Sequence, residues 1–160
     1  MKKLLFRTLT MLLLLAFTAV SAQEIDPPQD FFGFRMGTDR KLIDWKEIQS
    51  YLRYLEDSSP RIQVHSPGTT TLNRPFIYAL ISSEQNLENL TELQRIQQQF
   101  ANPYTLDRDE AEKLAQKGKA VVLLSFNIHS TEIASSQESV ELAWELVSAA
   151  KPRIQNILDN

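Results

Sequence analysis

The stretch KAVVLLSFNIHSTE, residues 119–132, constrains the fold more than any other part of the sequence. Residues 120–128 are almost all apolar and lack the alternation of a strand that has one face in water. Such a run is typical of a central β-strand that is covered on both faces. Polar residues follow at once, from His129 to Glu132. We therefore expect them at the carboxyl end of a buried strand, where open α/β sheets bind their ligands.

The sequence on either side of this run predicts an α/β fold. Apolar residues at helical spacing predict a helix over residues 42–55, with Thr38 or Asp39 as its N-cap. Residues 61–83 alternate around the turn-rich loop PGTTTLNRP and predict a β-hairpin. Helical patterns return over residues 84–118, which end on Gly118 as a C-cap, and a long helix is predicted from residue 133 to about residue 150.

These elements divide the chain into three segments. Residues 1–22 carry Lys2, Lys3 and Arg7, then an apolar run, then the small residues of a cleavage site, and are predicted to be a secretory signal peptide. Residues 23–40 are rich in Pro, Gly and Phe and are predicted to be an irregular lead-in whose aromatic side chains dock on the domain. Residues 41–160 form the predicted domain, with residues 84–118 as a helical surface insertion.

Composition narrows the possible partners and chemistry. The 160 residues contain no cysteine, which excludes disulfides, thiolate metal sites and a cysteine nucleophile. The net charge is −3 and no basic patch is interleaved with aromatic residues, so we expect no nucleic-acid partner. The signal peptide predicts a periplasmic or secreted protein that has no membrane segment once the peptide is cleaved. The sequence does not indicate an oligomeric state.

His129 and Glu132 are the candidate chemical groups at the end of the apolar run. A spacing of three can bring both side chains to one side of a strand-to-helix corner, and a neutral imidazole nitrogen and a carboxylate oxygen both suit Zn²⁺. Two ligands are incomplete, because catalytic zinc usually has three protein ligands. The alternative is structural: a histidine bonded to the main chain, and an acidic residue in the first turn of a helix, where the helix dipole favours negative charge.

At these residues the sequence resembles the zinc carboxypeptidase family, whose first metal motif is H-x-x-E at the end of a buried strand that leads into a helix. The motif reads NIHSTE here, and the resemblance extends back through KAVVLLSF, LNRPFIYAL and DWKEIQSYLRYLE. It covers roughly residues 41–150 in the family's order of elements. The resemblance implies the N-terminal portion of a mixed-sheet zinc carboxypeptidase-like fold.

The resemblance also implies roles for single residues. His129 and Glu132 would be two ligands of one Zn²⁺ ion, and the third ligand and the general base would lie beyond residue 160, so that no catalytic residue is expected in this chain. Thr131 stands where the digestive members of the family have an arginine that contacts substrate. His65, the other histidine, precedes the motif in the predicted hairpin and is expected to be structural.

The function implied is that of an exported zinc-dependent metallopeptidase that hydrolyses peptides, with the 160-residue chain itself expected to be inactive. Two alternatives stay open at this point. One is a non-catalytic exported binding module, or a pseudoenzyme, with the same fold. The other is an unrelated α/β domain in which His129 and Glu132 are structural.

Overall fold

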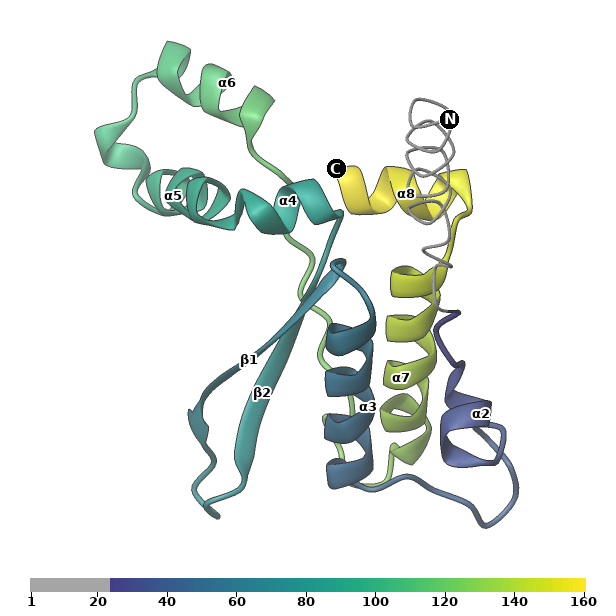
Figure 1. Cartoon of the computed structure of the whole chain (residues 1–160). Coiled ribbons are helices and arrows are strands. Elements are labelled where there is room, and N and C mark those ends of the chain that lie inside the picture. The colour runs from purple at the N-terminus through teal and green to yellow at the C-terminus, as the bar shows by residue number, and fades with distance from the viewer. Residues whose placement is uncertain (1–23) are drawn as a thin grey trace, which may run out of the picture.

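The computed structural model describes residues 24–160, and the predicted signal peptide lies outside the described residues. Among these residues helices dominate, and two strands form one antiparallel hairpin (Figure 1). The elements, in chain order, are α2 (Pro28–Phe32), α3 (Trp45–Ser58), β1 (Ile62–Thr69), β2 (Pro75–Ile81), α4 (Glu84–Glu88), α5 (Leu90–Ala101), the 3-10 turn η1 (Pro103–Thr105), α6 (Arg108–Lys117), α7 (Ile133–Ser148) and α8 (Pro152–Asp159).

The core lies where α3 meets α7 and the hairpin. Helices α3 and α7 lie side by side, with the hairpin next to α3 and the short helix α2 next to α7 (Figure 1). The side chains between these elements are apolar and buried, as expected of packed layers around a single core. They are Ile43, Ile48, Tyr51, Leu55, Ile62, Val64, Val140, Ala143 and Val147.

Helix α3 forms where helical spacing predicted it, but its start differs from the prediction. Asp44 is the N-cap. Its side chain accepts a hydrogen bond from the main-chain nitrogen of Glu47, and the Glu47 side chain accepts a hydrogen bond from the main-chain nitrogen of Asp44. This reciprocal capping box satisfies two main-chain donors at once. Neither Thr38 nor Asp39 caps the helix, because the chain makes a turn from Arg35 to Lys41 before α3 begins.

The predicted hairpin is confirmed. Strand β1 pairs antiparallel with β2 from Ile62 opposite Ile81 to His65 opposite Tyr78, and pairing resumes with Gly68 opposite Phe76. The register shifts between these pairs, where Pro67 has no main-chain N–H to give to a ladder. A bulge of this kind bends the strand that carries it. Before the bulge, residues 62–65 of β1 are buried or half-buried, and after it the strand is exposed.

The lead-in, predicted to be irregular, contains a short helix. Residues 28–32 form α2, which has a proline in its first turn and ends at Gly33 with a φ of 73°, a left-handed conformation that glycine adopts easily. The expected docking of aromatic side chains is confirmed for Phe32 and Phe34, which pack against the core. Phe31 adds an edge-to-face contact with Tyr51, with ring centroids 5.0 Å apart.

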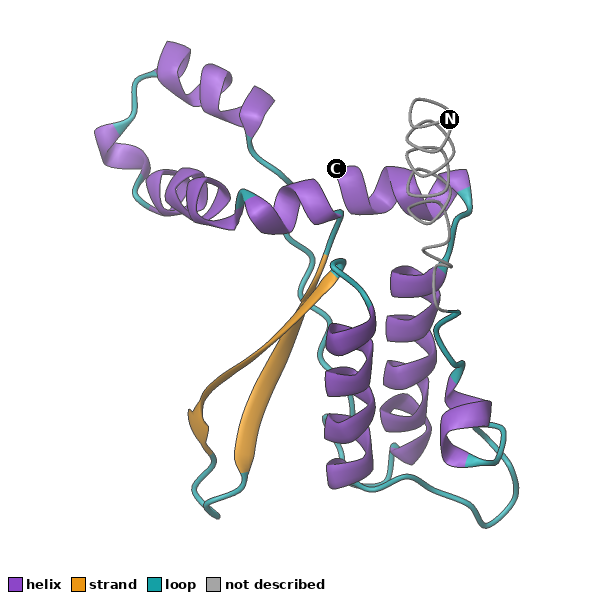
Figure 2. Cartoon of the chain, in the orientation of Figure 1, coloured by secondary structure: helices purple, strands orange, loops and turns teal. Residues whose placement is uncertain are grey.

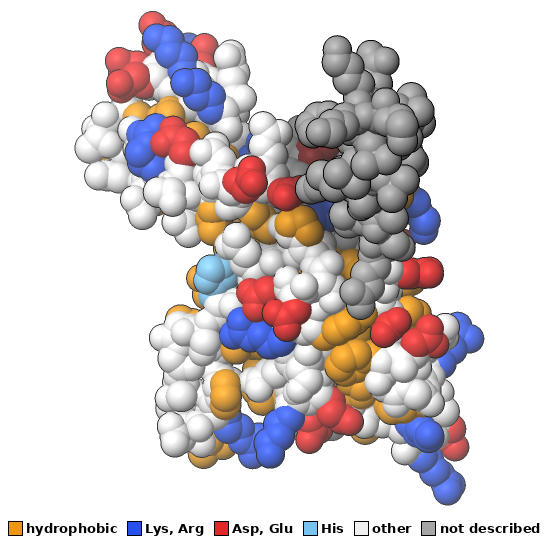
Figure 3. All heavy atoms as spheres, in the orientation of Figure 1, with side chains coloured by type: hydrophobic (Ala, Val, Ile, Leu, Met, Phe, Trp, Pro, Cys, Tyr) orange, Lys and Arg blue, Asp and Glu red, His pale blue; other side chains and the backbone are white. Residues whose placement is uncertain are grey.

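Residues 84–117 are helical, as predicted, and α5 and α6 extend away from the rest of the molecule (Figure 1). Charged side chains of both signs cover this arm (Figure 3). Asp107 caps α6 through a hydrogen bond from the main-chain nitrogen of Glu110, and Gly118 is its C-cap. Gly118 does not have a left-handed conformation. A Cβ atom there would lie 3.2 Å from Cγ2 of Ile96, so close packing explains the glycine.

The prediction that residues 120–128 form a buried central strand is wrong for the described chain. The segment runs behind the hairpin and α3 without regular structure (Figure 2), and none of residues 24–160 pairs with it as a strand. Its side chains are exposed, Val122 by 77% and Leu123 by 88%. A strand without a partner has no ladder of main-chain hydrogen bonds to hold it, so apolar composition alone cannot establish one.

The long helix predicted from residue 133 to about residue 150 is confirmed as α7, and a second helix, α8, follows it. Helix α7 buries Val140, Ala143 and Val147 against α3 and ends at Ser148. Pro152 begins α8, whose carbonyl at Leu158 accepts hydrogen bonds from the residues that follow β2. None of the helices in the described part of the chain has the length and apolar character needed to span a bilayer.

Candidate metal centre

His129 and Glu132 lie in the turn that joins the extended segment to α7. The main-chain nitrogen of Glu132 donates to the carbonyl of His129 at 2.9 Å, which closes the turn. Helix α7 begins at the next residue, Ile133, and no side chain caps it. Both candidate side chains therefore lie at the start of a helix, where exposed main-chain N–H groups favour negative charge.

The structure brings the two predicted side chains together. Nδ1 of His129 lies 2.8 Å from Oε1 of Glu132. The side chains are 72% and 54% exposed, respectively, so the pair faces open space. An imidazole nitrogen and a carboxylate oxygen held this close can share a proton, or can face one cation together once the imidazole is neutral.

The two side chains present are of types that bind zinc, but a third is missing from the described cluster. Nitrogen of histidine and oxygen of glutamate are both usual zinc ligands, with bonds of about 2.0–2.2 Å. Among residues 24–160, no third histidine, aspartate or glutamate joins them to form a cluster of three. The described chain therefore brings together two candidate ligands, whereas catalytic zinc usually takes three from protein.

His65 is in a different place and has different neighbours. It lies on β1, where its ring stacks on Tyr78 of β2 with centroids 5.0 Å apart. Its Nε2 atom is buried and bonds to no atom of the described chain. His65 is part of the hairpin and does not accompany His129, which is consistent with the structural role expected of it.

Two residues that sequence reasoning missed hold the turn. Asn127 has a φ of 57°, and its main-chain nitrogen donates to Oγ of Ser135 at 2.8 Å. The hydroxyl of Ser135 donates to the carbonyl of Glu132 at 2.9 Å. The signal for Asn127 was present, because asparagine before a turn often marks a left-handed conformation.

A groove of about 880 Å³ lies between residues 35–42 and α7, and neither His129 nor Glu132 lines it. Burial raises the pKa of the Glu141 carboxyl in its wall, and the nearby carboxylate of Glu138 raises it further, while Arg35 opposes both. Charges of both signs line the groove, so it favours neither an anion nor a cation.

The fold and the turn together describe a protein of mixed helices and strands with a paired imidazole and carboxylate suited to a metal ion. The sequence pattern of the zinc carboxypeptidase family matches residues 48–160, which include the hairpin, the arm and both candidate ligands. The chain belongs to the zinc carboxypeptidase family. No curated protein and no solved structure matches it.

Proposed function

We propose that His129 and Glu132 hold a zinc ion as part of the metal centre of a carboxypeptidase-type peptide hydrolase. The observation that carries the proposal is the 2.8 Å separation of His129 Nδ1 and Glu132 Oε1 in a member of the zinc carboxypeptidase family. Zinc is the metal that the family uses. We further infer that the described elements are part of the mixed-sheet fold of that family.

When bound, zinc in such a site polarises the scissile carbonyl and lowers the pKa of a coordinated water. This chain's contribution is to bind and orient the ion. His129 would offer Nδ1 as a neutral donor, so its remaining ring N–H needs an acceptor that fixes the tautomer. Glu132 would offer a carboxylate oxygen and would be a ligand and not the general base. Because no third candidate ligand joins the pair among residues 24–160, we expect a third ligand and a general base to be supplied from outside these residues.

The substrate class we propose is a peptide. Thr131 lies between the two ligands and is exposed, and it brings no positive charge to the turn. Thr131 therefore offers substrate no guanidinium at the position where the digestive members of the family have an arginine that contacts it. The predicted signal peptide supports a periplasmic or secreted site of action.

A second candidate function is a non-catalytic exported binding module, or a pseudoenzyme. The observation that favours it is that no third histidine, aspartate or glutamate joins the pair among residues 24–160. Under this alternative the His129–Glu132 pair is a proton-sharing contact that helps to close the turn. Removing one partner would then change the turn and leave metal content unaffected.

Metal analysis separates the two functions. The purified chain is equilibrated with zinc, dialysed and measured by atomic emission, as wild type and as His129→Ala, Glu132→Ala and His65→Ala. We expect the first two variants to lose most of the zinc that wild type retains, and the His65 variant to retain it. Equal zinc in wild type and His129→Ala would reject the ligand assignment.

A hydrolysis assay tests the catalytic part of the proposal. Release of C-terminal residues from a mixture of peptides is followed with zinc present. We expect the 160-residue chain to show little or no activity, because residues 24–160 bring together two candidate ligands and catalytic zinc usually has three. Robust zinc-dependent hydrolysis by this chain, absent in Glu132→Ala, would show that the third ligand is not needed and would contradict the proposal in its present form.

A further inference from the structure

The geometry points to Asn127 as a positioning residue for the metal centre. We propose that it holds the main chain of His129 and Glu132 in the arrangement that places their side chains together. The inference rests on the proposed function, because it assigns a purpose to a turn whose two side chains we propose to be zinc ligands. It adds a residue that neither touches the metal nor is one of its ligands.

The first support is the backbone of Asn127. Its φ of 57° lies in the left-handed region, which is strained for most L-residues. Asparagine is among the few residues that adopt it readily. The left-handed residue lies two residues before His129, where the segment without regular structure ends and the bend that leads into the turn begins.

The second support is the side chain of Asn127. With its amide nitrogen facing the turn, it donates to the carbonyl of Glu132 at 3.0 Å and to the carbonyl of His129 at 3.1 Å. One side chain thus bonds to the main chain of both proposed ligands. The His129 carbonyl also accepts the N–H of Glu132, so the two residues are tied to each other as well as to Asn127.

The third support is Ser135, which connects the same turn to the first turn of α7. Its hydroxyl accepts from the main-chain nitrogen of Asn127 and donates to the carbonyl of Glu132. Asn127, Glu132 and Ser135 therefore form a closed set of hydrogen bonds around an exposed corner. Partners of this kind orient ligands before the metal arrives, and their loss typically lowers metal affinity about 10–100-fold.

The substitution Asn127→Gly isolates the side chain. Glycine adopts a φ of 57° without strain, so the backbone conformation is retained while both amide hydrogen bonds are lost. The matched control is Asn73→Gly, because Asn73 also has a left-handed φ, of 55°, and lies in the hairpin loop. Melting temperatures of both variants report whether the fold survives.

Zinc binding is read from histidine ring resonances by NMR, with zinc chloride titrated into the full chain. The sequence contains two histidines, so the His129 signal is identified with His129→Ala, and His65 serves as an internal reference. We expect Asn127→Gly to weaken zinc binding at His129 by about 10-fold and Asn73→Gly to leave it unchanged. Amide exchange at Glu132, measured without zinc, should accelerate in Asn127→Gly alone.

The outcomes separate the inference from the proposed function. If zinc shifts the His129 ring in wild type and binding by Asn127→Gly stays within twofold, the positioning role is wrong and the ligand role stands. If zinc does not affect the His129 ring in wild type, the ligand role fails and the positioning role fails with it. A faster exchange of Glu132 with unchanged zinc affinity would show that Asn127 is structural only, which also overturns the inference.

Discussion

Gln137 on α7 makes two hydrogen bonds to the main chain of one residue, Ile43. Its Oε1 atom accepts from the Ile43 nitrogen at 3.1 Å, and its Nε2 atom donates to the Ile43 carbonyl at 3.3 Å. Both residues are buried. The amide thus satisfies a donor and an acceptor that would otherwise be unpaired in the core, just before α3 begins. This pair connects α7, which follows the turn of His129 and Glu132, to the segment that leads into α3.

The first prediction concerns this pair. Replacing Gln137 with Leu leaves the Ile43 N–H and C=O buried without partners, which costs about 1–3 kcal/mol for each unsatisfied group. We expect Gln137→Leu to lower the free energy of unfolding by at least about 2 kcal/mol in urea denaturation. Gln98→Leu, at an exposed position of α5, is the control and should change it by less than about 0.5 kcal/mol. Equal stability of the two variants would contradict the role of Gln137.

The second prediction concerns Tyr51, which is fully buried beneath the lead-in. Its hydroxyl donates to the Asp26 carbonyl at 2.8 Å, and burial, followed by the charges of its neighbours, raises its pKa far above the usual tyrosine value. Tyr51→Phe removes the donor and leaves that carbonyl unpaired. We expect a loss of about 1 kcal/mol in the free energy of unfolding, whereas Tyr104→Phe, 99% exposed, should have no effect on the same denaturation curve.

Much of the fold can be predicted from the sequence because the spacing of apolar residues within an element indicates which element it forms. The helix over α3, the hairpin and α7 each carry their apolar residues at the period of their own backbone, so periodicity predicts them without knowledge of neighbours. The N-cap of α3 was misplaced because three candidates precede the helix within seven residues. Only the reciprocal bonds of Asp44 and Glu47 decide among them, and those depend on where the lead-in turns.

The segment over residues 120–128 could not be predicted in the same way. A β-strand is defined by partners that are distant in the sequence, whereas an apolar run indicates only that burying the segment would be favourable and does not identify what would cover it. The His129–Glu132 pair was predictable because both residues lie within one turn. The support from Asn127 was harder to foresee, since it depends on a side chain that reaches forward to two carbonyls.

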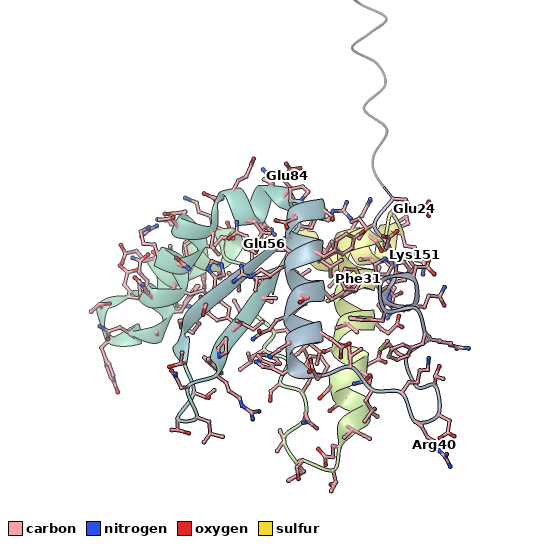
Figure 4. All side chains as sticks on the ribbon, turned by 60° about the horizontal axis from the view of Figure 1, so that its bottom comes forward. Glu24, Phe31, Arg40, Glu56, Glu84 and Lys151 are labelled. Atoms are coloured by element: carbon pink, nitrogen blue, oxygen red, sulfur yellow. The ribbon has the colours of Figure 1, made fainter. Side chains whose placement is uncertain are left out.

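The third prediction is a pH dependence at Glu56, which connects α3 to β1 (Figure 4). Burial raises the pKa of this carboxyl, but hydrogen bonds from the Val64 nitrogen and from Arg53 outweigh it, so its pKa is lowered overall. Because the folded pKa lies below the unfolded one, ionised Glu56 stabilises the fold above the unfolded value of about 4.3. That stabilisation is lost as pH falls through the folded pKa.

Glu56→Gln tests this dependence. We expect it to lower the free energy of unfolding at pH 7 by about 1 kcal/mol and the difference from wild type to shrink steadily as pH drops below about 4.3. The control is Glu88→Gln, at an exposed position of α4. Thermal denaturation across pH 3–7 measures both variants. A difference that stays constant down to the lowest pH would show that the charge of Glu56 is not what stabilises the contact.

The fourth prediction concerns the exposed apolar segment. Val121, Val122, Leu123 and Leu124 are consecutive, extended, and between 54% and 88% exposed. A segment that presents apolar side chains and free main-chain N–H and C=O groups pairs readily with other chains. We therefore expect the 160-residue chain to self-associate at high concentration, with light scattering that increases with concentration.

A charge in this segment opposes such pairing, since edge lysines make strand addition unfavourable. Leu123→Lys should lower the scattering several-fold and leave the melting temperature unchanged, because Leu123 is 88% exposed and contributes little to the core. Leu72→Lys is the matched control: Leu72 is 75% exposed in the hairpin loop and lacks an apolar run around it. If both lysine variants reduce scattering equally, net charge and not the segment governs association. If neither does, the segment is not the surface through which copies of the chain meet.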